Sequence, residues 1–277
     1  MAHPPLGELL AGFDAAQRRR GISPRTIRNR RYRIRALARD VEPRHVLDLD
    51  TRDLERWLDG LGVSNGSRAT YTDNLRAFYR WAAREGHIDT SPAEEIEVPK
   101  LGRRLPRPID DDDLARAFET ANPRMRAMLS LMAFEGARCI EVSRLRGEDV
   151  DTRAMTVTFH GKGDKERVVP LHPHTLDALR AYRLPKRGYI FVRHWGPGQG
   201  THPIGPEYVS QLVGRHLPDG WSAHKLRHWF GTQFYRASKD LLLTQEVMGH
   251  SRPETTAGYA RVDTSAAQAI VSRLRVG

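Results

Sequence analysis

The amino-acid sequence predicts a mainly helical protein with a small β-sheet, made of an all-helical N-terminal domain and a mixed α/β C-terminal domain. Apolar residues recur at helical spacing throughout residues 1–98, as at Leu75, Phe78 and Ala82. Between residues 155 and 171 the pattern changes to the alternation of apolar and polar residues that is typical of strands. A stretch rich in proline and basic residues separates the two patterns.

That stretch, residues 95–108, predicts an extended linker, because prolines interrupt both helices and strands. We therefore expect an N-terminal domain at residues 1–98, a linker at 99–108 and a C-terminal domain at 109–277. The basic side chains of the linker can follow a row of phosphate groups. These residues are Lys100, Arg103, Arg104 and Arg107.

Basic residues outnumber acidic ones, with 45 Lys and Arg against 34 Asp and Glu, which gives a formal charge of +11 and a pI near 10.2. This charge favours a polyanionic partner such as nucleic acid, and a generally basic proteome is the alternative. We expect neither a membrane span, which needs about 18 apolar residues in a row, nor a secretory signal. Cys139 is the only cysteine. No intrachain disulfide is therefore possible, which agrees with a reducing cytoplasm.

The second predicted helix carries a concentration of arginine. It begins after Ser23, a suitable N-cap, with Pro24 at the first helical position. Seven arginines lie from Arg25 to Arg39 with no acidic residue among them, so the helix lacks the acidic partners that normally occur four residues away. A solvated face is the alternative, but we expect contact with phosphate groups. The arginines assigned to this contact are Arg25, Arg28, Arg31 and Arg35.

The C-terminal domain is expected to begin with a helix that has an acidic first turn, Asp110–Asp113. The next helix has an apolar stripe that includes Met125 and Met132, and we assign this stripe to the core. Residues 155–171 predict a β-hairpin whose turn is Gly161–Asp164. Further helices are expected near residues 174–183, 206–217, 223–237 and 241–248.

Reactive side chains follow one another through this domain, and each has a structural explanation as well as a chemical one. Arg138 can pair with Glu141, which lies three positions later. Lys162 can be a solvent-exposed turn residue, because glycines flank it. His224 and Arg227 are three residues apart and share one face of the predicted helix.

Three further residues complete the set. His228 is expected to face away from His224 and to have a structural or supporting role. His250 can satisfy carbonyls at the end of a helix, and Tyr259 can be a packing residue, although its small neighbours leave the hydroxyl accessible. We expect no metal site, because the sequence has no HExxH motif and one cysteine cannot build a Cys-based zinc site.

Four stretches contain these residues: EGARCIEVSRLRGEDV, FHGKGDKERVVPL, SAHKLRHWFGT and VMGHSRPETTAGYARV. Together they resemble the catalytic boxes of the tyrosine recombinases, the phage integrase family. The stretch FYRWAAREGHIDTSPAEEIEVPK resembles the end of the core-binding domain of that family, so the resemblance covers both halves of the chain. It implies a SAM-like N-terminal domain that clamps DNA and a tyrosine recombinase catalytic domain.

The resemblance also implies roles for the reactive residues. Tyr259 would attack phosphorus to give a 3′-phosphotyrosyl link, and Lys162 would protonate the leaving 5′-oxygen, without a metal, ATP or any cofactor. Glu141 would orient an arginine, and His228 would support the site. The residues that bind the scissile phosphate would be Arg138, His224, Arg227 and His250.

The implied function is site-specific recombination through a Holliday junction, for integration, excision or dimer resolution. A type IB-like topoisomerase or strand transferase, and a catalytically silent DNA-binding protein, are the alternatives. The implied partners are double-stranded DNA, further copies of the chain that form a tetramer on paired sites from free monomers, and accessory DNA-bending proteins, without a membrane. The apolar stripe after Tyr259 would be an exchange segment that docks into a neighbouring subunit. We expect a Xer-like recombinase or a short phage integrase, because no length remains for an arm-binding domain.

Overall fold

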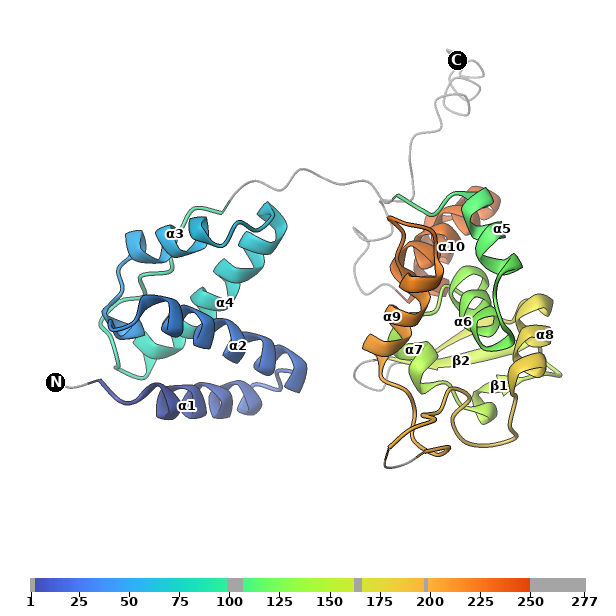
Figure 1. The fold of residues 1–277 in the computed structure, drawn as a ribbon, viewed down its shortest axis with the longest axis horizontal. Helices are drawn as coiled ribbons and strands as arrows, with labels where there is room; N and C mark the ends of the chain where they lie inside the picture. Colours follow the sequence, from blue (N-terminus) through green and yellow to red (C-terminus); the bar gives the residue numbers. More distant parts are fainter. Residues whose placement is uncertain (1–2, 99–106, 162–165, 197–198, 250–277) are drawn as a thin grey trace, which may run out of the picture. The chain divides into compact units, whose positions relative to one another are not determined.

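The computed structural model describes residues 3–98, 107–161, 166–196 and 199–249 of the 277-residue chain. The chain divides into two compact units, Met1–Arg103 and Arg104–Gly277, and each is described by itself (Figure 1). The prediction of a mainly helical fold with a small β-sheet is confirmed.

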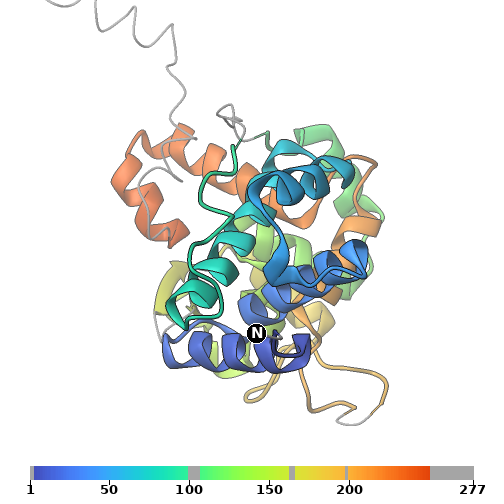
Figure 2. The ribbon, with the colours of Figure 1, turned by 90° about the vertical axis from the view of Figure 1, so that its left-hand side faces the viewer.

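In its described part, the first unit contains helices only (Figure 2). Its second helix begins as expected, because Ser23 Oγ accepts a hydrogen bond from the Thr26 backbone N–H at 3.3 Å and Pro24 occupies the first helical position. Ser64 caps the last helix in the same way. The elements are α1 (Leu6–Arg19), α2 (Pro24–Val41), the 3-10 helix η1 (Val46–Asp48), α3 (Thr51–Gly60) and α4 (Asn65–Arg84).

An aromatic cluster fills the core of the first unit. Phe13 of α1 packs edge-on against Phe78 of α4, with ring centroids 5.5 Å apart, and Trp81 lies 5.4 Å from Phe13. Tyr79 is fully buried, and its hydroxyl donates a hydrogen bond to the Val46 carbonyl at 2.7 Å. Buried aromatic rings supply much apolar contact area, so these contacts hold α1 and η1 against α4.

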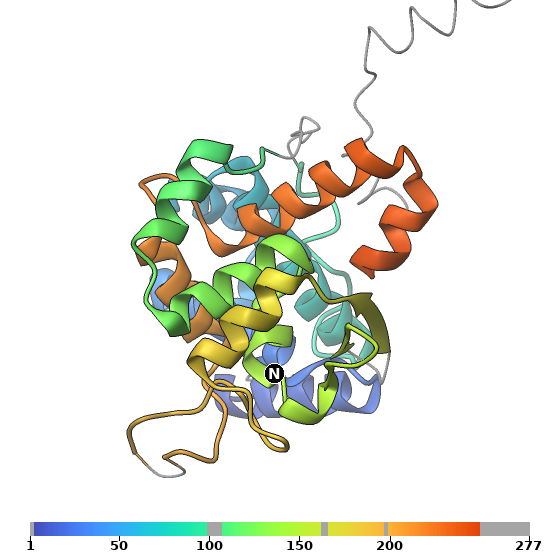
Figure 3. The same cartoon turned by 90° about the vertical axis from the view of Figure 1, so that its right-hand side faces the viewer.

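The second unit combines helices with a small sheet (Figure 3). The four helices expected after the hairpin are present as the last four helices of the described part of the unit. The elements are α5 (Asp111–Glu119), α6 (Pro123–Phe134), α7 (Cys139–Arg144), the 3-10 helix η2 (Gly147–Asp149), β1 (Val150–Asp151), β2 (Thr156–His160), β3 (Glu166–Pro170), α8 (Pro173–Tyr182), α9 (Pro206–His216), α10 (Ala223–Ser238) and α11 (Leu241–Met248).

The sheet is antiparallel with the order β1-β2-β3. The register of the hairpin pairs Val157 with Val169 and His160 with Glu166, which confirms the predicted hairpin. The sequence analysis did not predict β1. This strand has two residues, which is too short to produce a recognisable alternation.

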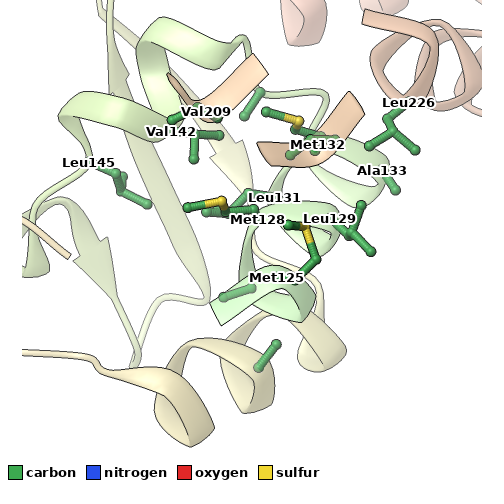
Figure 4. Packing of buried hydrophobic residues seen from close by; sticks show 14 of the residues in the cluster. Met125, Met128, Leu129, Leu131, Met132, Ala133, Val142, Leu145, Val209 and Leu226 are labelled. Carbon is green, nitrogen blue, oxygen red and sulfur yellow. The ribbon is translucent and has the colours of Figure 1, made fainter. Parts of the chain in front are cut away.

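Helix α6 is the central helix of the second unit. Its predicted stripe is buried, and the side chains from Ala127 to Ala133 are buried as well, so this part of the helix is enclosed on every side. Figure 4 shows Met128 and Met132 in one apolar cluster with Val142 of α7 and Leu226 of α10. Alongside α6 lies α8 (Figure 3). No helix in the described part of the chain combines the length and the apolar character needed to cross a membrane.

A carboxylic acid is buried where α6 ends. Glu135 accepts hydrogen bonds from the His172 backbone N–H at 2.9 Å and from the Thr175 hydroxyl at 3.0 Å. Its side chain is inaccessible to solvent. Burial raises the pKa of Glu135 to about 8, against the opposing effect of the two hydrogen bonds. Glu135 therefore joins the end of α6 to the start of α8 and is mainly protonated at neutral pH.

We predict that Glu135→Gln removes a pH-dependent loss of stability. Folded Glu135 keeps its proton up to about pH 8, whereas the unfolded side chain releases it near the ordinary value of 4.5. The wild type therefore loses stability as pH rises from 4.5 towards 8, by up to about 3 kcal/mol at pH 7. Urea unfolding at several pH values should show a smaller decline for Glu135→Gln. Glu119→Gln, an exposed control on α5, should keep the wild-type decline; equal declines in all three proteins would contradict the prediction.

Candidate active site

The turn between α6 and α7 presents Arg138 at the surface. Gly136 makes this turn with φ +61°, and a Cβ at this position would lie 2.4 Å from a ring carbon of Phe230. Glycine is therefore required for the chain to pass here. Arg138 occupies the N-cap position of α7, and its side chain is 37% exposed, so a ligand can reach it.

Glu141 holds Arg138 in place, as the sequence predicts. Nη1 of Arg138 donates to Oε1 of Glu141 at 2.7 Å, and the Arg138 backbone N–H donates to Oε2 at 2.7 Å. The Glu141 side chain is only 2% exposed. This buried carboxylate therefore fixes both the main chain and the guanidinium of Arg138 through charge-assisted hydrogen bonds.

Arg138 and Arg227 converge on the C-terminal end of α11. Nη2 of Arg138 donates to the Gly249 carbonyl at 2.9 Å and to the Met248 carbonyl at 3.4 Å. Arg227 is buried and donates to the same Met248 carbonyl through Nη2 and to the Gly136 carbonyl through Nη1. The last carbonyls of a helix carry partial negative charge and attract cations. Two arginines from separate stretches of the sequence therefore lie at one place.

Helix α10 adds two histidines to this group. His224 lies close enough to Arg138 and Arg227 to be affected by the charge of both. The expectation that His228 faces away from His224 is wrong, because the two rings are in T-shaped contact with centroids 4.4 Å apart. Residues four apart are neighbours on a helix face, so the spacing itself predicts this contact.

Both imidazoles are held in the neutral form. Desolvation by the surrounding protein lowers the pKa of His224, even though part of its side chain is exposed. The positive charges of Arg227 and Lys225 lower this pKa further. Burial, followed by the neighbouring His224, lowers the pKa of His228 to about 4. A neutral imidazole keeps one unprotonated ring nitrogen, so His224 can accept a proton at neutral pH.

Arg167 of β3 is a third arginine at this site, and the sequence analysis did not identify it. Nη2 of Arg167 donates to Glu141 Oε2 at 2.8 Å, and Nη1 donates to the Val247 carbonyl at 2.6 Å. One sequence signal exists. Alternate residues of a strand share a face, which places Arg167 on the same face as the buried Val169, and a charged residue on a core-facing side needs a buried partner.

The described residues do not include the whole predicted catalytic set. Three members lie outside the described part of the chain: Lys162, His250 and Tyr259. In the sequence, Lys162 falls between the last residue of β2 and the first residue of β3, and His250 follows Gly249. The described part of the site thus consists of the two predicted arginines, the two histidines, Glu141 and Arg167.

The arginine run of the first unit is only partly as expected. Arg25, Arg28 and Arg35 are exposed on α2. Nη1 of Arg31 instead pairs with Asp14 at 2.9 Å, and the Asp14 side chain is 3% exposed. The run lacks acidic partners four residues away, as expected, but Arg31 has an acidic partner on α1, which the pattern within one helix does not reveal.

The predicted linker is described only at its C-terminal end. Lys100, Arg103 and Arg104 lie outside the described residues. Arg107 is exposed, and its guanidinium lies 5.7 Å from the centroid of the Trp221 ring. This distance is within the range of a cation–π contact, which holds Arg107 near the start of α10.

One group of side chains in the described part of the chain has the spacing of a cation site. The ligand atoms of His3, His45 and Asp48 lie within 4.8 Å of one another. Nδ1 of His45 accepts the Leu47 backbone N–H at 3.3 Å, so the other ring nitrogen of the neutral imidazole carries the proton and is not free to bind a metal. This group belongs to the first unit, whereas the arginine site is built entirely from the second.

Two family models match the chain. Residues 107–266 match the phage integrase family, and residues 12–86 match the phage integrase N-terminal SAM-like domain. The first match alone covers more than half of the 277 residues. The expected combination of a SAM-like domain with a recombinase catalytic domain is confirmed.

Curated relatives are similar over most of the chain. Tyrosine recombinase XerC 2 of Ralstonia nicotianae is 31% identical over 303 aligned residues, which cover 98% of this chain and 86% of that protein. Tyrosine recombinase XerC of Haemophilus influenzae is 30% identical over 268 residues, which cover 91% of each chain.

Solved structures share the fold. A lambda integrase dimer bound to a COC′ core site has a TM-score of 0.74 and 19% identity, over 94% of this chain and 78% of that one. The XerH site-specific recombinase bound to a palindromic difH substrate has a TM-score of 0.69 and 20% identity, over 92% and 81%. Since the family model matches the catalytic unit and the XerC relatives match nearly the whole chain, this chain belongs to the phage integrase family and is a tyrosine recombinase.

Proposed function

We propose that this recombinase cuts and rejoins double-stranded DNA at specific sites, through a 3′-phosphotyrosyl intermediate and a Holliday junction. The observation that carries the proposal is the convergence of Arg138 and Arg227 on the end of α11, beside the neutral His224. Two guanidiniums and an imidazole at one place suit a phosphodiester. The similarity to XerC recombinases favours recombination over the relaxation of supercoils by a topoisomerase.

The arginines suit a phosphate because the planar guanidinium binds two oxygens and keeps its charge at every relevant pH. The carbonyls of Met248 and Gly249 accept hydrogen bonds from these donors. Phosphate oxygens carry a larger negative charge and compete for them. Charge on these oxygens increases as phosphorus becomes five-coordinate, so donors already in position stabilise the transition state more than the ground state.

The proposed cleavage step transfers two protons. Tyr259 attacks phosphorus while its hydroxyl proton passes to His224, and the tyrosyl ester forms as the bond to the 5′-oxygen breaks. Lys162 gives a proton to that oxygen, so the released strand ends in a 5′-hydroxyl. His250 donates to a non-bridging oxygen. The ester conserves the energy of the broken bond, so attack by another 5′-hydroxyl rejoins the strands without ATP.

The first unit and the linker are proposed to hold the duplex. We assign residues 1–98 to a DNA clamp, residues 99–108 to the linker and residues 109–277 to catalysis. The positive charges proposed to contact DNA phosphates are those of Arg25, Arg28, Arg31, Arg35, Lys100, Arg103, Arg104 and Arg107.

The proposed active form on DNA is a tetramer. Exchange between two duplexes requires four strand cuts and therefore four active sites, whereas the free chain is proposed to be monomeric. The segment after Tyr259 contacts a neighbouring subunit, and accessory DNA-bending proteins bring the two sites together. Native gel electrophoresis with and without paired sites tests this assembly, and a tetramer in the absence of DNA would contradict it.

We predict that Tyr259→Phe abolishes the covalent adduct while leaving DNA binding intact, because the substitution removes only the attacking oxygen. The substrate is a nicked duplex that the wild-type chain has captured covalently from a random-sequence library, and it is called the captured duplex below. Adducts are measured on denaturing gels and binding on native gels. Tyr208→Phe, on α9, is the matched control and should retain the adduct. An adduct that survives in Tyr259→Phe would remove Tyr259 from this role.

We predict that Lys162→Ala slows cleavage of the captured duplex by roughly 10²–10⁴-fold, the usual contribution of a general acid. A substrate with sulfur in place of the 5′-bridging oxygen has a leaving group that needs no proton. It should therefore restore much of the lost rate. Single-turnover cleavage of both substrates provides the measurement. A sulfur substrate that Lys162→Ala cleaves no faster than the ordinary one would show that Lys162 only binds DNA.

We predict that DNA affinity falls steeply with salt and that the exposed arginines of α2 cause part of this dependence. Each phosphate neutralised on duplex DNA contributes about −0.9 to the log–log slope. Arg28→Ala/Arg35→Ala should therefore make the slope shallower by about 1–2, measured by fluorescence anisotropy on a labelled duplex. Arg31→Ala is the comparison, and it should change the slope less because Arg31 already pairs with Asp14. An unchanged slope in the double variant would mean that this face of α2 does not contact DNA.

A further inference from the structure

The Glu141 carboxylate binds the guanidiniums of Arg138 and Arg167. Arg167 has no role in the reaction proposed above. Nη2 of Arg167 donates to Oε2 of Glu141 at 2.8 Å, and Nε donates to Oε1 at 3.4 Å. Arg138 donates to the same two oxygens through its backbone N–H and Nη1. The side chains of Glu141 and Arg167 are 2% and 10% exposed, so water contributes little to this cluster.

The other contacts of Arg167 fix its guanidinium in one position. Nη1 donates to the Val247 carbonyl at 2.6 Å, and Nη2 donates to the Gly136 carbonyl at 3.3 Å. The guanidinium also lies over the Phe159 ring, 4.5 Å from its centroid. Partners from β2, α7, α11 and the turn after α6 therefore hold the group. A lysine has one terminal nitrogen and cannot make these contacts together.

The charges of the cluster do not cancel. Burial alone raises the pKa of Glu141, but the hydrogen bond and charge of Arg167, and after them those of Arg138, lower it below its ordinary value. The carboxylate is therefore ionised, and Arg167 is its main counter-ion. The Glu141 carboxylate and the two guanidiniums of Arg138 and Arg167 together carry a net charge of one positive unit. Arg138 is the more exposed of the two arginines, so the net positive charge is accessible to a ligand at Arg138.

We propose that Arg167 is a positioning residue of the recombination reaction: it neutralises Glu141, so that Glu141 orients Arg138 without cancelling the charge that Arg138 offers to the scissile phosphate. The proposal rests on the role given to Arg138 in the proposed function. Arg167 is directed at Glu141 and at backbone carbonyls, and it binds no DNA. Without Arg167, Arg138 is the one cation among the described residues that pairs with Glu141, and Glu141 draws that guanidinium away from the phosphate.

The test measures single-turnover adduct formation on the captured duplex. Arg167→Gln should slow this step by about 10²-fold, the usual effect of a displaced catalytic group, with unchanged DNA affinity. The double variant Arg167→Gln/Glu141→Gln removes both charges and should recover at least about tenfold of the lost rate, because neighbouring groups are coupled. Arg180→Gln, an exposed arginine on α8, is the matched control and should react like the wild type.

A second variant separates positioning from support of the fold. Arg167→Lys keeps the positive charge opposite Glu141 but loses the several N–H donors of the planar guanidinium, so it should react about tenfold faster than Arg167→Gln. Thermal unfolding shows that each variant is folded. If Arg167→Gln does not fold, a folded Arg167→Lys that is slowed by about 10²-fold overturns the inference, and a loss below about tenfold supports it.

Two further results would overturn the inference while leaving the proposed function intact. The first is a wild-type rate for Arg167→Gln. The second is a double variant as slow as Arg167→Gln, because the slow rate of Arg167→Gln would then not come from Glu141 drawing Arg138 away from the phosphate. A wild-type chain that captures no duplex from the library would overturn the proposed function, and this inference with it.

Discussion

One buried carboxylate determines the arrangement of the catalytic unit. Glu141 binds the guanidinium and the backbone of Arg138 and receives a second guanidinium from Arg167. Burying a charge is unfavourable unless opposite charges and hydrogen bonds compensate, and here two cations do so. Because Arg167 also binds carbonyls at the ends of α6 and α11, this single ion cluster connects the consecutive helices α6 and α7 with β3 and with α11, which comes much later in the sequence.

Two glycines let the backbone approach these cations closely. Gly136 and Gly249 follow the ends of α6 and α11 with φ values of +61° and +59°. A Cβ at position 249 would lie 2.7 Å from Cδ of Arg167, and one at position 136 would lie against the Phe230 ring. Backbone carbonyls, which have fewer conformations than long side chains, therefore fix the guanidiniums.

Much of this molecule could be predicted from the sequence wherever the determining contact is local. The Ser23–Pro24 helix start, the hairpin and the Arg138–Glu141 pair all involve residues within a few positions of one another. The pairing of Arg31 with Asp14 could not be predicted in this way, because the acid comes from another helix. Arg167 was missed for the same reason, since its partners come from four separate segments. The error at His228 is different, because its i,i+4 spacing from His224 was available.

The contacts that complete the site join positions far apart along the chain. Arg138 donates to carbonyls 110 and 111 residues later, and Arg167 donates to one 80 residues later. A growing polypeptide leaves the ribosome from its N-terminus, so α11 is made after every other helix of the described part of the chain. The first unit and the sheet of the second are therefore made before the carbonyls that these arginines bind. A chain that ends before α11 therefore lacks the carbonyls that hold Arg138, Arg167 and Arg227 together.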